Sequence, residues 1–474
     1  MRKIILSIAL AGVLALPVTA LSACGKKEAA RCSYQIEAEY LEGTLNATVR
    51  VAVVNDTQNA LEKIPFVLYG NAFSEEAELP VSELFSSACY YDGESYGGME
   101  IHSVEGAASF EITGGGSILT AYLSEPLYPD ECVTLTVDYT LSLAKVNHRL
   151  GVGENCVNLS YFYPMLFAQN ESGFYEYAPS AVGDPFVLPC ADFLIKLTLP
   201  REYTLACGGK AVRQEEGDKA IYLYEAECVR DAAFVLGNFE TSSAVSGGVE
   251  IEYYHFADED PAYTLGAACA ALATYTRLFG EYPYERFVLA ETDLYLGGME
   301  YSGFVAISSL LRREERASVV AHEAAHQWWY ALVSSDQNAC AWQDEGLAEY
   351  SVALFYENNP DYQKSYRDLI AASEGAYRSY YSIKSQLSSE VDTSMSRPLR
   401  SFSGDYEYRV LAYDKGVVLF DRLRSTMGEK RFFAALKRYT GAYAFCVASE
   451  ADLIGCFSSQ EGLILSFTQG RCVI

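Results

Sequence analysis

The residues best suited to chemistry form an H-E-x-x-H sequence, in which His322 and His326 are four residues apart and Glu323 follows the first histidine. On a helix, side chains four apart lie on one face, so both imidazoles can bind a single metal ion. A carboxylate beside the first ligand can take a proton from a water molecule that zinc activates. Residues 311–333 contain no proline or glycine, so we expect a helix there.

A third ligand is expected downstream of these two histidines. Glu345 follows His326 after 18 intervening residues and begins a second segment with helical character. Two histidines and one glutamate leave a fourth position open, which is typical of a catalytic zinc and not of a closed structural one. The alternative is a buried helix with two core histidines, but it does not account for Glu345. The pattern therefore predicts one Zn²⁺ bound by His322, His326 and Glu345.

The wider pattern resembles the aminopeptidase N family of zinc metallopeptidases, which also contains the leukotriene hydrolase. Glu345 lies within W-x-x-E-G-x-A, as in that family. Residues 297–301 (GGMEY) are similar to the family's G-x-M-E-N exopeptidase motif, and residues 413–416 (YDKG) to its Y-x-K-G motif. The similarity extends from about residue 158 to about residue 467, with the motifs in the same order.

This resemblance implies a role for each motif. Glu323 would be the general base, and Tyr413 would donate a hydrogen bond to the oxyanion of the tetrahedral intermediate. Glu300 would bind the free α-ammonium of the substrate, which fixes the register of cleavage. Tyr301 stands where the family usually has asparagine. Three residues before Glu300 complete the expected substrate-binding segment: Gly297, Gly298 and Met299.

Glu349 lies one helical turn after Glu345. We expect its carboxylate to hold a zinc-binding imidazole in the correct tautomer, as is common around zinc sites. A plain solvated helix face is the alternative for this residue. The three other histidines lie far from the motifs and are expected to be structural.

The elements that must position these residues predict a multidomain α+β fold. Residues 34–246 contain apolar or alternating runs of strand length separated by Gly, Pro, Asn and Asp, which is typical of a β-sandwich-like domain. Residues 247–474 combine short strands with helices, the layout of a thermolysin-like, mainly α-helical catalytic domain. Strands are expected at 47–54, 133–139, 193–199, 249–254, 287–290 and 304–308. Helices are expected at 261–279, 345–357, 409–424 and 430–440.

The first 23 residues have the pattern of a signal peptide, with Arg2 and Lys3 before an apolar run that reaches residue 18. Residues 21–24 (LSAC) resemble a bacterial lipobox, which is cut before the cysteine, so Cys24 would carry the lipid. Residues 24–33 would form a tether, and the protein would be membrane-anchored on the extracytoplasmic side. The alternative is an uncleaved anchor helix, but the run is shorter than the about 20 apolar residues that span a bilayer.

Composition narrows the function further. The chain has 474 residues, half of them hydrophobic, which fits a globular protein of two or three domains. A formal net charge of −28 argues against nucleic acid as a partner. Twelve of the 13 cysteines remain after Cys24, without a C-x-x-C pair. Buried free thiols and disulfides both stay open for them.

The sequence thus predicts a zinc aminopeptidase that acts on peptides with a free N-terminus. A thermolysin-like endopeptidase is the first alternative, because it would share the zinc site without needing an amine anchor. A surface peptide-binding protein without turnover is the second. The presence of Glu323 and Tyr413 argues against this second alternative, since a pure binder needs no general base.

Overall fold

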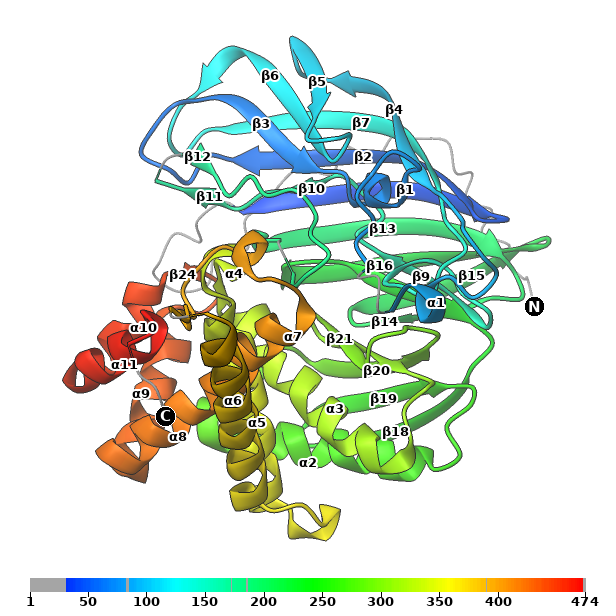
Figure 1. The fold of residues 1–474 in the computed structure, drawn as a ribbon. Coiled ribbons are helices and arrows are strands. Elements are labelled where there is room, and N and C mark those ends of the chain that lie inside the picture. Colours follow the sequence, from blue (N-terminus) through cyan, green and yellow to red (C-terminus); the bar gives the residue numbers. More distant parts are fainter. Residues whose placement is uncertain (1–30, 82–84, 172, 185, 389, 472–474) are drawn as a thin grey trace, which may run out of the picture. The chain divides into compact units, whose positions relative to one another are not determined.

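The computed structural model describes residues 31–81, 85–171, 173–184, 186–388 and 390–471. The predicted signal peptide and Cys24 lie outside these described residues. From Arg31 onward the chain forms one contiguous unit, with strands dominating its first half and helices its second (Figure 1). Within the described ranges, no helix is both long and apolar enough to cross a membrane.

The largest sheet has seven strands in the order β15-β16-β13-β1-β2-β7-β4. Along β1, Tyr34 and Ile36 are buried while Gln35 and Glu37 are exposed, the period of two expected when one face of a sheet packs on a core. The strands predicted at 47–54, 133–139 and 193–199 lie in this sheet. Its members are β1 (Cys32–Leu41), β2 (Thr44–Val54), β4 (Gly98–Glu105), β7 (Cys132–Ser142), β13 (Ala191–Pro200), β15 (Lys210–Glu216) and β16 (Lys219–Val229).

Two four-stranded sheets share a hydrophobic core with the largest sheet, through side chains such as Phe66, Leu159 and Phe234. This is the β-rich first part of the predicted fold. One sheet contains β10 (Met165–Leu166), β3 (Leu61–Val67), β6 (Ile118–Leu127) and β5 (Ser109–Thr113). The other contains β14 (Thr204–Cys207), β17 (Ala233–Gly237), β9 (Cys156–Ser160) and β8 (Leu150–Val152). Shorter elements are η1 (Tyr69–Phe73), α1 (Ser86–Cys89), β11 (Gln169–Asn170) and β12 (Gly173–Phe174).

A five-stranded sheet in the order β18-β19-β20-β22-β21 supports the second half of the chain. Gly247 and Gly248 form the turn between its first two strands with φ of 60° and 90°, a conformation that favours glycine. The domain boundary expected after residue 246 falls in this turn, so β18 belongs with the later sheet. The strands are β18 (Glu240–Ser246), β19 (Val249–His255), β20 (Arg286–Thr292), β21 (Gly298–Tyr301) and β22 (Phe304–Ser308).

Helices account for most of the remainder (Figure 1). The long ones are α2 (Pro261–Phe279), α3 (Arg313–His326), α5 (Glu345–Asn358), α6 (Tyr366–Leu387), α8 (Lys415–Met427) and α9 (Glu429–Ala442). Shorter ones are α4 (Gln337–Cys340), α7 (Asp405–Tyr408), α10 (Glu450–Cys456) and α11 (Glu461–Thr468). The 3₁₀ segments are η4 (Ala341–Gln343), η5 (Pro360–Tyr362), η6 (Leu399–Ser401) and η8 (Ser458–Gln460), and a short bridge joins β23 (Ser334–Ser335) to β24 (Val447–Ala448).

The structure differs from the expected helices in two ways. Sequence reasoning missed α6, because its buried stripe contains Ser373, Tyr377 and Tyr380 and therefore looks polar. The single helix expected over 311–333 is α3 followed by a π-helical segment, η3 (Gln327–Leu332). A second π-helical segment, η7 (Arg409–Asp414), precedes α8. Such segments are rare and occur frequently at functional sites.

Candidate metal centre and active site

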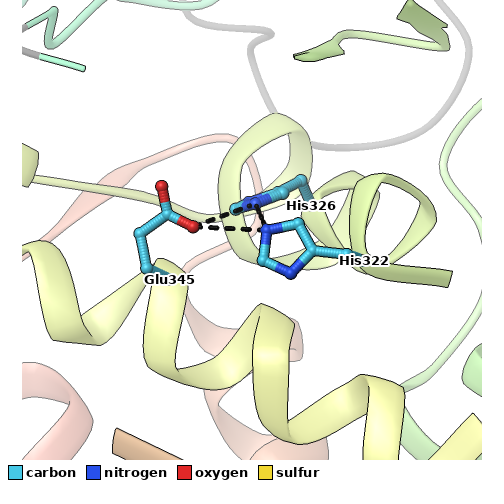
Figure 2. A group of neighbouring side chains, drawn as sticks. All are labelled: His322, His326 and Glu345. Atoms are coloured by element: carbon cyan, nitrogen blue, oxygen red, sulfur yellow. Dashed lines mark hydrogen bonds and ion pairs between the residues drawn. The ribbon is translucent and has the colours of Figure 1, made fainter. Parts of the chain in front are cut away.

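Three predicted ligands meet between two helices (Figure 2). His322 and His326 project from α3, and Glu345 is the first residue of α5. Glu345 Oε2 lies 3.3 Å from His322 Nε2 and 3.5 Å from His326 Nε2, and the two Nε2 atoms are 3.1 Å apart. Ligand atoms about 2.05 Å from a tetrahedral zinc are separated by about 3.3 Å. The spacing and the donor set therefore fit one Zn²⁺.

Hydrogen bonds behind the imidazoles point their Nε2 lone pairs at this centre. His322 Nδ1 lies 3.0 Å from Glu349 Oε2, and His326 Nδ1 lies 2.7 Å from Asp344 Oδ1. A carboxylate holds the proton on Nδ1, so Nε2 is left free for a metal. Glu349 thus lies where the sequence analysis expected an orienting carboxylate. Sequence reasoning missed Asp344, because its position next to Glu345 does not show which way its side chain points.

Asp344 is itself supported by a buried amide. Gln337 Nε2 donates to Asp344 Oδ2, and both side chains are buried. Gln337 begins α4, whose N-cap is Asp336, which accepts from the backbone N–H of Ala339 at 3.1 Å. The segment between the two ligand helices therefore holds the acceptor of His326 in place.

The expected general base lies beside the metal ligands. Glu323 is 5% exposed, and burial raises the pKa of its carboxyl group to about 7. A Cβ atom on Gly298 would overlap Glu323 Oε1. Gly298 therefore leaves room for this carboxylate, in addition to the close substrate approach that we expected from it. Any side chain at this position would displace the base.

Glu300 shares a strand face with Gly298, because alternate residues of β21 point the same way. Its side chain is 6% exposed, and burial raises the pKa of its carboxyl group well above the usual range. Met299 points to the other face and joins the core of the β-rich half. Gly297, Gly298, Met299 and Glu300 all line one cavity with the metal ligands.

Tyr413 lies in η7, and its ring stacks on the imidazole of His322 with centroids 5.8 Å apart and an interplanar angle of 6°. The YDKG motif that contains Tyr413 packs against the W-x-x-E-G-x-A motif that contains Glu345. A Cβ on Gly416 would lie 2.6 Å from the Cα of Gly346, so both glycines are needed for α5 and α8 to approach. The Tyr413 hydroxyl hydrogen-bonds to the Glu345 carboxylate, so it lies beside the metal ligands in the same cavity.

The cavity has a volume of about 540 Å³ and receives side chains from both halves of the chain. Arg149 and Asp184, from the β-rich half, form an ion pair in its wall, and both are nearly buried. Sequence reasoning missed this pair. Carboxylates outnumber guanidinium groups in the lining: Asp184, Glu300, Glu323, Glu345, Glu349, Asp405 and Asp414 against Arg149 and Arg409. The cavity therefore favours a cationic group on a ligand.

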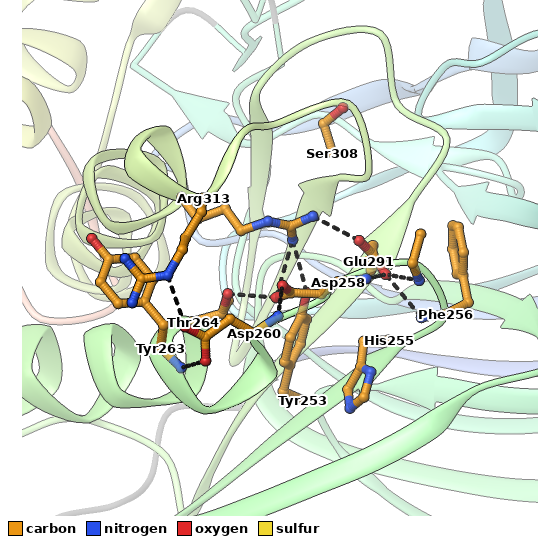
Figure 3. A network of polar contacts seen from close by, with 12 residues as sticks. Tyr253, His255, Phe256, Asp258, Asp260, Tyr263, Thr264, Glu291, Ser308 and Arg313 are labelled. Carbon is orange, nitrogen blue, oxygen red and sulfur yellow. Dashed lines mark hydrogen bonds and ion pairs between the residues drawn. The ribbon is translucent and has the colours of Figure 1, made fainter.

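A buried ionic network fixes the helix that carries the two histidines. Arg316 of α3 lies 2.9 Å from Glu291 Oε1 and 3.3 Å from Asp258 Oδ2. It also donates to the Tyr253 hydroxyl at 3.0 Å, and Glu291 Oε2 accepts the backbone N–H groups of residues 256–258. Figure 3 shows Tyr253, Asp258 and Glu291 of this network. Because Arg316 precedes His322 by six residues, the network ties the ligand helix to the five-stranded sheet.

Residues 263–469 match the family model described as the Peptidase family M1 domain. Aminopeptidase M1-A of Oryza sativa subsp. japonica is 24% identical over 399 residues, which cover 75% of this chain and 44% of the rice protein. Endoplasmic reticulum aminopeptidase 2 of Homo sapiens is 25% identical over 255 residues, covering 50% of this chain and 26% of the human protein. The chain spans less than half the length of these curated relatives.

Solved structures resemble nearly the whole chain. The M1 zinc metallopeptidase from Deinococcus radiodurans has a TM-score of 0.65 at 18% identity, covering 94% of this chain and 95% of that one. A mutant of the M1 zinc metallopeptidase from that organism, bound to a Tyr-Ser-Ala substrate, has a TM-score of 0.63 at 17% identity, with the same coverage. These likenesses confirm the predicted fold class, a β-rich N-terminal part followed by a mainly helical part.

The site and fold define a zinc metallopeptidase of the gluzincin type, with two histidines on one helix and a glutamate on the next. Residues 263–469 match peptidase family M1, and the motifs of the chain resemble those of the aminopeptidase N family. This match implies one catalytic Zn²⁺, and His322, His326 and Glu345 fit that ion by donor type and spacing.

Proposed function

We propose that the chain is a zinc-dependent aminopeptidase that removes N-terminal residues from peptides with a free α-amine. The position of Glu300 carries this proposal, because its buried carboxylate lines the same cavity as Glu323 and the metal ligands. A carboxylate in that place would pair with the substrate ammonium and bring the first peptide bond to the metal. The excess of acidic side chains in the cavity also supports a substrate with a positively charged N-terminus.

The chain's own groups divide the reaction between them. When bound, zinc would polarise the scissile carbonyl and lower the pKa of water. Glu323 would accept the proton of the attacking water and deliver it to the leaving amine. Tyr413 would donate its O–H to the carbonyl oxygen as negative charge develops there. Asp344 and Glu349 would keep the imidazole protons on Nδ1, away from the metal.

Paired substrates test this proposal. The chain that starts after Cys24 would be given aminoacyl amides with a free or an acetylated N-terminus, beside a Glu323→Gln control. We expect turnover of the free-amine set alone, and its loss in the control. Equal turnover of both sets would favour a thermolysin-like endopeptidase. Bound zinc without hydrolysis of either set, or of longer peptides, would favour a peptide-binding protein.

We also propose that the protein is exported and anchored to the membrane through a lipid on Cys24. The support is the sequence of residues 1–24, a charged end and an apolar run before LSAC. Metabolic labelling with a radioactive fatty acid would test it. The parent chain should incorporate label and sediment with membranes, whereas a Cys24→Ala variant should do neither. Equal labelling of both chains would contradict the assignment.

A further inference from the structure

Two cysteines face each other where β13 and β16 begin to pair. Ala191 lies opposite Val229 and Phe193 opposite Ala226, so β16 has one residue more than β13 in this interval. Cys228 lies in that bulge with φ of 55°, in the left-handed region that side chains rarely adopt. Bulges redirect side chains, and strained backbone clusters at functional positions.

The strand pairing brings the two thiols together, because Cys190 precedes Ala191, Cys228 precedes Val229, and Ala191 lies opposite Val229. Both cysteines are reduced in the structure. The neighbouring Cys190 side chain, together with the guanidinium of Arg31, lowers the pKa of the Cys228 thiol to about 6. A cysteine beside an arginine has more thiolate character and is the nucleophilic partner of such a pair. Cys190 is therefore placed to act as the resolving thiol.

The pair lies at a junction between the two halves of the chain. Arg230, two residues after Cys228, donates to the carbonyl oxygen of Leu188 at 3.1 Å and to that of Tyr330, in η3, at 2.7 Å. Phe186, four residues before Cys190, lines the active-site cavity. A covalent bond at Cys190 would fasten the segment 186–190 that forms part of the cavity wall.

We propose that Cys190 and Cys228 are a dithiol site that forms an intramolecular disulfide with a small disulfide as the oxidant. The Cys228 thiolate would attack one sulfur of oxidised glutathione and release one glutathione thiolate. Cys190, after losing its proton to solvent, would attack the Cys228 sulfur of the mixed disulfide and release the second glutathione. Two cysteine thiols are oxidised, and one small disulfide is reduced to two thiols.

Peptide mapping after oxidation tests this inference directly. The chain that starts after Cys24 would be incubated with oxidised glutathione, blocked with an alkylating reagent and digested without reductant. We expect a peptide pair linked through Cys190 and Cys228, and its disappearance after treatment with dithiothreitol. Glutathione retained on Cys228 without the linked pair would overturn the inference, as would two unmodified thiols.

Variants separate the two thiols from the other cysteines. Cys190→Ser should leave glutathione on Cys228, because the resolving thiol is missing, whereas Cys228→Ser should leave Cys190 unmodified. Cys132→Ser is the control, since it removes an exposed thiol elsewhere and should keep the linked pair. The same modification of Cys190 and Cys228 in the single variants would contradict the assigned roles.

Thermal unfolding gives a second readout. The disulfide would close a loop of 38 residues, and for a chain of this size the oxidised form should melt about 4 °C above the reduced form. The Cys190→Ser variant should show no such difference between the two conditions. If the parent chain carries the crosslink but melts at the same temperature as its reduced form, the disulfide does not stabilise the cavity wall, and this part of the inference is contradicted.

Discussion

Replacing Asp344 by asparagine measures how far zinc affinity depends on the carboxylates behind the two imidazoles. Asp344 Oδ1 lies 2.7 Å from His326 Nδ1, and both side chains are 1% exposed. Glu349 Oε2 lies 3.0 Å from His322 Nδ1, but its side chain is 35% exposed. An amide keeps the acceptor oxygen in each case and removes the charge, so the two variants compare the same change at different depths.

The expected magnitudes follow from this difference in burial. A hydrogen bond to a charged group contributes about 1.5–3 kcal/mol, and a neutral one about 0.5–1.5 kcal/mol. Loss of the Asp344 charge should therefore cost about 1.4 kcal/mol, which raises the Kd for zinc about tenfold. Water screens Glu349, so Glu349→Gln should raise the Kd by no more than about threefold.

Competition with a chromophoric zinc chelator at pH 7 would measure both Kd values, and chemical unfolding of the metal-free chains would check that each variant is folded. The reasoning is refuted if Asp344→Asn binds zinc within twofold of the parent. It is refuted equally if Glu349→Gln is the weaker binder of the two. Either result would mean that burial does not decide which of the two carboxylates contributes more to zinc affinity.

Four further predictions concern other parts of the molecule. Glu300→Gln should lower kcat/KM for free-amine substrates about 10- to 100-fold with zinc content unchanged, because it removes a charge-assisted bond of about 1.5–3 kcal/mol; unchanged kinetics would contradict the amine assignment. Gly298→Ala should lower kcat more than zinc content, because its Cβ displaces Glu323; a fully active variant would disprove this reading of the glycine. Arg316→Leu should cost about 3–5 kcal/mol in urea unfolding, since it leaves buried carboxylates unpaired, and a loss below about 1 kcal/mol would contradict the network's role. Burial alone would raise the pKa of Glu407, but hydrogen bonds from Ser403 and Tyr380 and the charge of Arg397 lower it to about 2. Its stabilisation, about 3 kcal/mol above pH 4.5, should therefore be lost between pH 4.5 and 2, and a Glu407→Gln variant that unfolds in acid with the parent's pH dependence would contradict this.

The metal ligands could be predicted because their geometry depends on local spacing. His322 and His326 are one turn apart on a single helix, and Glu345 begins the next one. Strand β13 of the largest sheet could be predicted from alternation, which a one-sided sheet requires, whereas β20 and β22 could be predicted from continuous apolar runs. These features are short-range, so the sequence carries them directly.

The remaining site residues depend on long-range packing. Arg149 and Asp184 reach the cavity only because the β-rich half packs against the later sheet, and nothing near them in sequence indicates an ion pair. The direction of Asp344 is set by the short helices between residues 337 and 343. Helix α6 shows the same limit, since tyrosine and serine become core residues only when a neighbouring surface receives them.

The contact between Gly346 and Gly416 has a consequence for how substrate entry and chemistry are related. It joins α5, which begins with the metal ligand Glu345, to α8, which directly follows the segment of Tyr413, without intervening side chains. The metal ligand and the expected oxyanion donor therefore move as one rigid body. The cavity wall, in contrast, is divided between the two halves of the chain. A breathing motion between these halves would widen the cavity and admit a peptide, while the distances that govern bond cleavage stayed constant.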